Sequence, residues 1–297
     1  MTLEELLTLA RGGDLDALGA ERDAVSDAVR ALADAGDGAS ACELVGRAWR
    51  IWFSRGELEE GSAAATTALD APGAESVPVW RARVLYADGL FAFRSGDRER
   101  SLARNDEALR VAREAADVGG ECDALTGLAR VALRDGRYEE VVALARQARE
   151  RARVVGDREA EAAPLHLEAA GVRLQQDYSS ARELYLESLD LNTALGNAAW
   201  VAMEHHNLGW VELHLGDVDE AERHFRDRDA QAGTDAYGNA WSNLNWAAVA
   251  VARGDADEAE RHFAEGEQAL EELGSALDPD DQSELDWLSG QMQRIRV

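Results

Sequence analysis

The sequence has 297 residues and a formal net charge of −27, and it contains no lysine, so that all 31 basic residues are arginines. An acidic surface of this kind repels phosphate backbones, which argues against nucleic-acid binding by the surface as a whole. No apolar run reaches transmembrane length, and the acidic N-terminus lacks the basic region of a signal peptide. We therefore expect a cytoplasmic protein without membrane contact.

In chain order, residues 1–35 are helical in composition but match the later pattern poorly, and we expect them to form an N-terminal cap or irregular repeat. Residues 36–276 are expected to form six repeats of about 40 residues. The repeats are aligned on a short turn, usually glycine followed by an acidic residue. These turns are Gly13-Asp14, Gly56-Glu57, Gly96-Asp97, Gly136-Arg137, Gln176-Asp177, Gly216-Asp217 and Gly254-Asp255.

The turn residues explain how each repeat reverses direction. Glycine ends a first helix in the left-handed conformation that a Cβ atom disfavours, and the following aspartate can cap a second helix. Gln176 breaks this rule, so we expect it to tolerate the left-handed conformation poorly or its turn to differ. Small or apolar residues five and nine positions after the turn, such as Ala221 and Phe225, fall on one helical face.

The pattern predicts an all-α fold, a right-handed α-α superhelix of about seven helical hairpins with capping helices, and one domain over residues 1–297. Residues 277–297 are read as a C-terminal capping helix. Its apolar stripe consists of Leu285, Leu288, Met292 and Ile295. Cys42 and Cys122 lie in separate repeats and are expected to be free thiols.

Two segments carry a resemblance to a known family. Asn207-Leu208-Gly209-Trp210, Leu215-Gly216-Asp217, Ala221 and Phe225 resemble the tetratricopeptide signature, although the period here is longer than the one typical of that family. The stretch 48–61 is similar to the C-terminal tetratricopeptide sensor region of actinobacterial LuxR-type and SARP-type NTPase regulators. Because neither a phosphate-binding loop nor a basic helix-turn-helix is present, the resemblance implies the sensor part without the NTPase or DNA-binding domains.

In tetratricopeptide folds the first helix of each pair lines a concave groove, and the resemblance places a set of residues there. They are Arg50, Arg83, Tyr86, Phe93, Arg94, Asp123, Thr126, Arg130, Arg134, His166, Arg173, Met203, His206, Trp210, His214 and Trp241. With Glu43, the groove positions hold six arginines against two acidic residues, in a chain with 58 acidic residues and 31 arginines. The charge balance therefore inverts in the groove.

Arginine binds carboxylates and phosphates bidentately. We therefore expect an adaptor or sensor module, with no cofactor, whose groove holds an acidic peptide, a partner protein or an anionic small molecule. The simpler alternative is that these arginines only pair with neighbouring acids such as Asp88 and Asp135. A third reading is a homo-oligomeric scaffold.

A second hypothesis is an enzyme with a pocket near His206, Trp210, His214 and Trp241. Its mark would be a deep closed cavity containing an unpaired histidine. Fifty-eight acidic residues single out no catalytic pair, and no activated serine or cysteine is apparent, so the enzyme is the weaker expectation. His206 and His214 are too far apart along a helix to share a metal comfortably.

Overall fold

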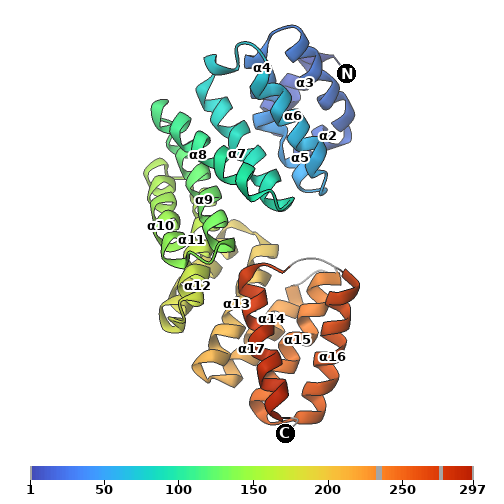
Figure 1. The fold of residues 1–297 in the computed structure, drawn as a ribbon, viewed down its shortest axis with the longest axis vertical. Coiled ribbons are helices and arrows are strands. Elements are labelled where there is room, and N and C mark those ends of the chain that lie inside the picture. The colour runs from blue at the N-terminus through green and yellow to red at the C-terminus, as the bar shows by residue number, and fades with distance from the viewer. Residues whose placement is uncertain (1, 232–235, 274–276, 296–297) are drawn as a thin grey trace. The chain divides into compact units, whose positions relative to one another are not determined.

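The computed structural model describes residues 2–231, 236–273 and 277–295, and within these ranges every regular element is a helix (Figure 1). The helices form seven hairpins, so the predicted all-α solenoid is confirmed. Their bounds are α1 (Leu3–Gly12) with α2 (Leu15–Ala20) and α3 (Arg22–Asp34); α4 (Gly38–Ala48) and α5 (Arg50–Phe53) with α6 (Leu58–Asp70); α7 (Pro78–Arg94) with α8 (Arg98–Glu114); α9 (Val118–Arg134) with α10 (Tyr138–Val155); α11 (Arg158–Leu174) with α12 (Tyr178–Leu195); α13 (Ala198–Leu215) with α14 (Val218–Gln231); and α15 (Ala236–Arg253) with α16 (Ala256–Leu273).

Two further elements complete the description. The short 3-10 helix η1 (Ala74–Ser76) precedes α7, and α17 (Pro279–Ile295) follows the last hairpin. The ends of the predicted repeats (274–276) and of the predicted cap (296–297) lie outside the described residues. None of the described helices is both long enough and apolar enough to cross a membrane.

The contacts divide the chain into two compact units, which are described separately. Unit 1 comprises residues 1–131 and 147–160, and unit 2 comprises residues 132–146 and 161–297, so α9 and α10 contribute to both. The core of unit 1 contains Trp52, Leu85 and Phe91. The largest core cluster of unit 2 contains Trp210 and Trp241.

The predicted turns lie where the spacing placed them. All six anchor glycines have positive φ, and Gln176 adopts the same conformation with φ 65°. The backbone hydrogen bonds at Gln176 and Gly216 are equivalent, since each N–H donates to the carbonyl three residues earlier, at 2.8 and 3.1 Å. The expectation that the turn at Gln176 differs is therefore wrong, because the packed hairpin imposes the conformation on a residue with a Cβ atom.

A second series of left-handed residues, absent from the predicted pattern, lies between hairpins. Gly36, Ala116, Gly156 and Gly196 have φ values of 74°, 54°, 69° and 73°. They follow the second helices, just as the anchor residues follow the first helices. Repeats that contain two such turns and two long helices, such as α7 and α8 with 17 residues each, account for the long period.

The close approach of paired helices depends on a small residue seven positions before the anchor. At Gly209 on α13, an added Cβ atom would lie 2.2 Å from the ring of Phe225 on α14. That distance is far inside van der Waals contact, so only glycine allows this ring to pack against the first helix.

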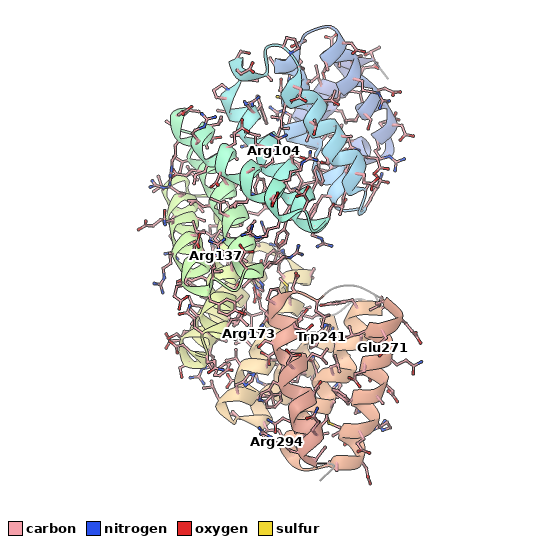
Figure 2. The ribbon with its side chains drawn as sticks, in the orientation of Figure 1. Arg104, Arg137, Arg173, Trp241, Glu271 and Arg294 are labelled. Carbon is pink, nitrogen blue, oxygen red and sulfur yellow. The ribbon has the colours of Figure 1, made fainter. Side chains whose placement is uncertain are left out.

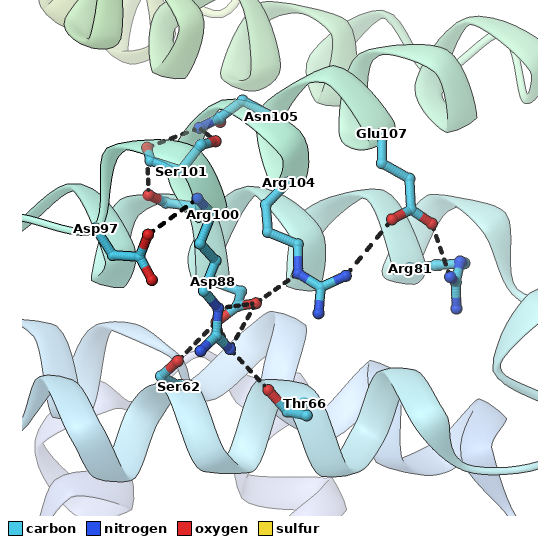
Figure 3. Close-up of polar contacts among 11 residues, drawn as sticks. Ser62, Thr66, Arg81, Asp88, Asp97, Arg100, Ser101, Arg104, Asn105 and Glu107 are labelled. Carbon is cyan, nitrogen blue, oxygen red and sulfur yellow. Dashed lines mark hydrogen bonds and ion pairs between the residues drawn. The ribbon is translucent and has the colours of Figure 1, made fainter.

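A buried ion-pair network joins α6, α7 and α8 in unit 1 (Figure 3). The carboxylate of Asp88 is fully buried and accepts hydrogen bonds from Arg100 at 2.8 Å, Arg104 at 2.8 Å and Ser62 at 2.8 Å. Removing one partner of such a network would leave a buried charge uncompensated, so its role is structural.

Replacing Gln176 with glycine tests the strain at the exceptional turn. The left-handed conformation costs a residue with a Cβ atom about 1–2 kcal/mol, and the greater freedom of glycine in the unfolded chain offsets part of this. We expect Gln176→Gly to raise the free energy of unfolding by about 0.5–1 kcal/mol, measured by urea denaturation.

The matched control is Gly216→Gln, at an equivalent turn where an added Cβ atom would meet nothing within 4 Å. It should destabilise the protein by a similar amount. The same sign for both substitutions would contradict the explanation by backbone strain.

Candidate functional site

Four arginines gather on the first helices of unit 1, and we call them the arginine cluster: Arg50, Arg83, Arg94 and Arg130. They lie on α5, α7 and α9. Arg50, Arg83 and Arg94 are exposed and Arg130 is half-buried. Three of them, Arg50, Arg83 and Arg130, act electrostatically on the same carboxyl group, that of Asp123 on α9. The structure therefore brings together side chains that come from three separate repeats.

No carboxylate of the described residues forms an ion pair within 4 Å of any member of the arginine cluster. The acids that the simpler alternative offered are engaged elsewhere: Asp88 pairs with Arg100 and Arg104, and Asp135 pairs with Arg137 at 2.9 Å. The other predicted acidic groove residue, Glu43, pairs with Arg11 at 2.8 Å and Arg47 at 3.1 Å. The cluster therefore keeps its positive charge available.

Asp123 is the carboxyl group on which three arginines of the cluster act, but its burial disfavours the ionised form. It is half-buried, and burial raises the pKa of its carboxyl group to about 6, against the opposing effect of Arg83, Arg50 and Arg130. Tyr86 is buried beside it, and its hydroxyl oxygen accepts a hydrogen bond from Arg130 at 3.2 Å. Burial therefore outweighs the three arginines, none of which forms an ion pair with this carboxylate within 4 Å.

Aromatic rings support the guanidinium groups of the cluster. Arg50 lies 4.5 Å from the ring centre of Trp49, and Arg94 lies 5.7 Å from that of Phe53. Arg83 lies 5.2 Å from Trp80. Stacking on a ring orients a guanidinium while leaving its N–H groups free for a ligand. Trp80 was not predicted, because it lies before Arg83, the first residue of its helix that the tetratricopeptide resemblance places in the groove.

Two predicted groove residues of unit 1, Thr126 and Phe93, pack toward the interior. Thr126 is buried, and its hydroxyl donates to the carbonyl oxygen of Cys122 at 2.8 Å. Phe93 is half-buried and packs against the unit 1 core. Neither presents a free polar group to a ligand.

In unit 2 the predicted arginines contact the acidic start of α17. Arg134 donates to Asp278 at 3.3 Å. Arg173 is buried and donates to Asp280 at 3.1 Å, and it also lies 3.5 Å from Glu284. Figure 2 shows Arg173 beside α17. These two arginines therefore pair with acids of the same chain, but with acids distant in sequence and not with the neighbouring acids that the simpler alternative named.

The four residues of the hypothetical enzyme pocket also lie under α17. His214 contacts Glu284 at 2.7 Å and the ring of Trp287 at 5.1 Å. His206 lies 3.2 Å from Asn245 Nδ2 and 3.6 Å from Asp281. Each of these two histidines has a protein partner, so neither is the unpaired histidine that the enzyme hypothesis requires.

The remaining aromatic and neutral groove residues of unit 2 belong to its interior. Trp210 is fully buried and donates to Asn245 at 2.9 Å, and Trp241 is 2 % exposed. Met203 is half-buried. The two tryptophans therefore serve as core residues and offer no open stacking platform.

His166 is held by an internal partner. Its Nδ1 atom lies 3.1 Å from the buried Glu204 carboxylate. Burial opposes the charged ring, but the charge of Glu204 and its hydrogen bond outweigh burial and raise the pKa of His166.

The two thiols are poorly suited to nucleophilic chemistry. Both cysteines are free and buried, as the expectation of free thiols requires. Burial raises the pKa of Cys42 to about 11 and that of Cys122 to about 12. Because the thiolate is the reactive form, neither thiol is activated.

Comparison with known families identifies the repeat. The family model described as tetratricopeptide repeat matches residues 123–147, 205–227 and 240–265. These segments span the turns at Gly136, Gly216 and Gly254, so three of the predicted repeats match the tetratricopeptide model. No curated protein matches the sequence.

Solved structures share the fold at low sequence identity. A Rap protein complexed with competence and sporulation factor has 15 % identity and a TM-score of 0.63, with 99 % of this chain and 86 % of that chain covered. The apo form of the quorum sensor NprR from B. thuringiensis has 15 % identity and a TM-score of 0.64, covering 96 % and 78 %. BtubC from P. vanneervenii has 20 % identity and a TM-score of 0.60, covering 74 % and 93 %. These likenesses show a tetratricopeptide-like α-solenoid.

Because burial disfavours the ionised form of Asp123, the effect of Asp123→Asn on stability should depend on pH. The pKa of the Asp123 carboxyl group is about 6 in the folded protein and 3.8 ordinarily. Between about pH 4 and pH 6 the folded wild type therefore keeps a proton on Asp123 that the unfolded chain has already lost. Wild-type stability therefore falls as the pH rises from about 4 to 6, whereas the neutral asparagine avoids this loss.

We expect Asp123→Asn to raise the free energy of unfolding by about 1 kcal/mol at pH 8 and by almost nothing at pH 4, as measured by denaturant titration at both pH values. Asp106→Asn, at an exposed position of α8, removes the same charge and serves as the control. An equal effect of Asp123→Asn at both pH values would show that folding does not raise the pKa of the Asp123 carboxyl group.

Proposed function

We propose that this chain is a protein-interaction module that binds an acidic peptide segment of a partner protein through the arginine cluster of unit 1. The observation that carries the proposal is the contrast among the arginines. Most arginines of the described chain pair with acids, whereas Arg50, Arg83, Arg94 and Arg130 form no ion pair with the described residues. The first three rest on aromatic rings, and Arg130 donates a hydrogen bond to the Tyr86 hydroxyl. A ligand carboxylate would supply the missing charge.

The chemistry of the cluster favours an extended acidic ligand. Its arginines come from three successive first helices, so a chain that crosses these helices can place several carboxylates on them. Charge-assisted hydrogen bonds to arginine are stronger than neutral ones, and bidentate pairs add geometric selectivity. The acidic remainder of the surface would repel the same ligand, which confines it to the cluster and speeds the encounter.

The comparisons support this class of function by analogy. A Rap protein of the same fold is described in complex with competence and sporulation factor, and NprR is described as a quorum sensor. The resemblance of residues 48–61 to the sensor regions of actinobacterial regulators points the same way. We therefore place the module in a regulatory pathway, as an adaptor or sensor. An anionic small molecule is the second ligand class that this chemistry fits.

Selection from a random displayed peptide library tests the proposal, because it lets the protein choose its own ligand. Immobilised wild-type protein should enrich peptides rich in aspartate and glutamate. The triple variant Arg50→Gln, Arg83→Gln, Arg130→Gln should bind the enriched peptides about 100-fold more weakly, because each lost charge-assisted contact costs about 1 kcal/mol on a partly exposed surface.

The control removes the same total charge elsewhere. Arg110, Arg223 and Arg261 are exposed and lie on second helices, where each pairs with a neighbouring acid. Their triple replacement by glutamine should leave affinity within about two-fold, since remote exposed charges are screened by salt. Equal loss in both triple variants, or no enrichment of acidic peptides by the wild type, would refute the proposal.

A further inference from the structure

Acidic residues just before α17 and in its first two turns lie against the first helices of unit 2. Asp278 contacts Arg134 on α9, Asp280 contacts Arg173 on α11, and Glu284 contacts His214 on α13. Asp281 accepts a hydrogen bond from the Tyr237 hydroxyl on α15. A helix that only capped the array would cover the last hairpin, whereas α17 contacts the first helices of four successive hairpins.

An aromatic and aliphatic anchor follows the acidic turn on the same helix. The ring of Trp287 lies edge-on to Trp210 with ring centres 5.9 Å apart, and Leu288 and Met292 are buried in the core cluster of unit 2. Such a pattern, with acids in the first turn and large apolar residues in the next turns, is that of an amphipathic helix lying in a groove.

The surface beneath α17 requires carboxylates. Arg173 is 2 % exposed, and the carboxylates that act on its guanidinium (Asp280, Asp281 and Glu284) all lie on α17. The Arg173 guanidinium is therefore buried against the carboxylates of Asp280 and Glu284, and removing one partner from such a pair is strongly unfavourable.

The fit at Arg173 is incomplete. Its Nε and Nη1 atoms are buried without a hydrogen-bond partner among the described residues, and only Nη2 donates, to Asp280. A guanidinium has five N–H donors. A carboxylate placed more favourably would therefore gain hydrogen bonds that α17 does not provide, which makes α17 replaceable by a better ligand.

We propose that α17 is an intramolecular ligand, and that the surface it covers on α9, α11, α13 and α15 accepts an acidic amphipathic helix of a partner protein when α17 is displaced. The partner helix carries carboxylates in its first turn and an aromatic residue one to two turns later. This inference concerns unit 2 and does not rest on the arginine cluster of unit 1, so either proposal can fail alone.

Competition in trans tests the inference on the full-length chain. The probe is a fluorescein-labelled peptide with the sequence of residues 277–295, measured by fluorescence anisotropy. In the wild type the tethered helix has a high effective concentration and should exclude the peptide. The variant Glu284→Gln weakens the tethered helix but leaves the surface intact, so it should bind the peptide at least 10-fold more tightly than the wild type.

Two controls isolate the carboxylate. Asp286→Asn removes the same charge from an exposed position of α17 and should behave as the wild type. A peptide that itself carries glutamine in place of Glu284 should bind the Glu284→Gln chain at least 10-fold more weakly than the unmodified peptide. Equal binding by all three chains, or indifference to the change in the peptide, would overturn the proposal.

Amide hydrogen exchange on the wild-type protein tests the proposal without any variant, and so applies even if Glu284→Gln does not fold. The amides of α17 should exchange through local opening faster than those of α13 and α15. Exchange of α17 only together with α13 would show that it is an integral part of unit 2 and would overturn the proposal. Light scattering that shows a wild-type dimer held together by α17 would assign the surface to a second copy of the chain and would also overturn it.

Discussion

The left-handed turn residue is the constraint on which the rest of this structure depends. It reverses the chain in few residues and satisfies the last carbonyl groups of the helix before it. In the described residues it recurs both within hairpins and between several of them, and the helices from α7 to α13 have 17 or 18 residues each. The persistence of the conformation at Gln176, where it is strained, shows that hairpin packing outweighs the local preference of the residue.

The distribution of charge on those first helices gives the fold its chemical character. In unit 2, the predicted groove residues Arg134, Arg173, His206 and His214 all contact carboxylates of α17 or of Asp278 just before it. In unit 1, the arginine cluster forms no ion pair with the described residues, and burial raises the pKa of the Asp123 carboxyl group to about 6. Unit 2 therefore holds an acidic segment of its own chain, and we propose that the arginine cluster of unit 1 binds an acidic segment of a partner.

Much of the fold could be predicted from the sequence because the signals are local. The regularly spaced glycines, the aspartate caps and the small residues such as Gly209 each act within one hairpin. The candidate site could be predicted only in part. Arg50, Arg83 and Arg130, predicted for the groove, all act on Asp123, and their role in binding stays a prediction. Thr126, Trp210 and Trp241 lie inside, because position on a helix does not reveal what covers that position. Contacts such as Arg173 with Asp280 join residues 107 apart in the sequence and have no local signal. The sequence did offer one signal for these contacts, because acidic residues gather at the start of α17 while arginines are in excess at the groove positions.

Side-chain NMR of the arginines tests the central claim most directly, since it observes each guanidinium group separately. The protein would be titrated with an acidic peptide obtained by library selection, and the Nε–Hε signals would be followed. The account predicts that the signals of Arg50, Arg83 and Arg130 shift together and become protected from solvent exchange, while those of the exposed, ion-paired Arg110 and Arg261 stay unchanged. Uniform small shifts across all arginines, or binding that leaves the three cluster signals in place, would contradict it.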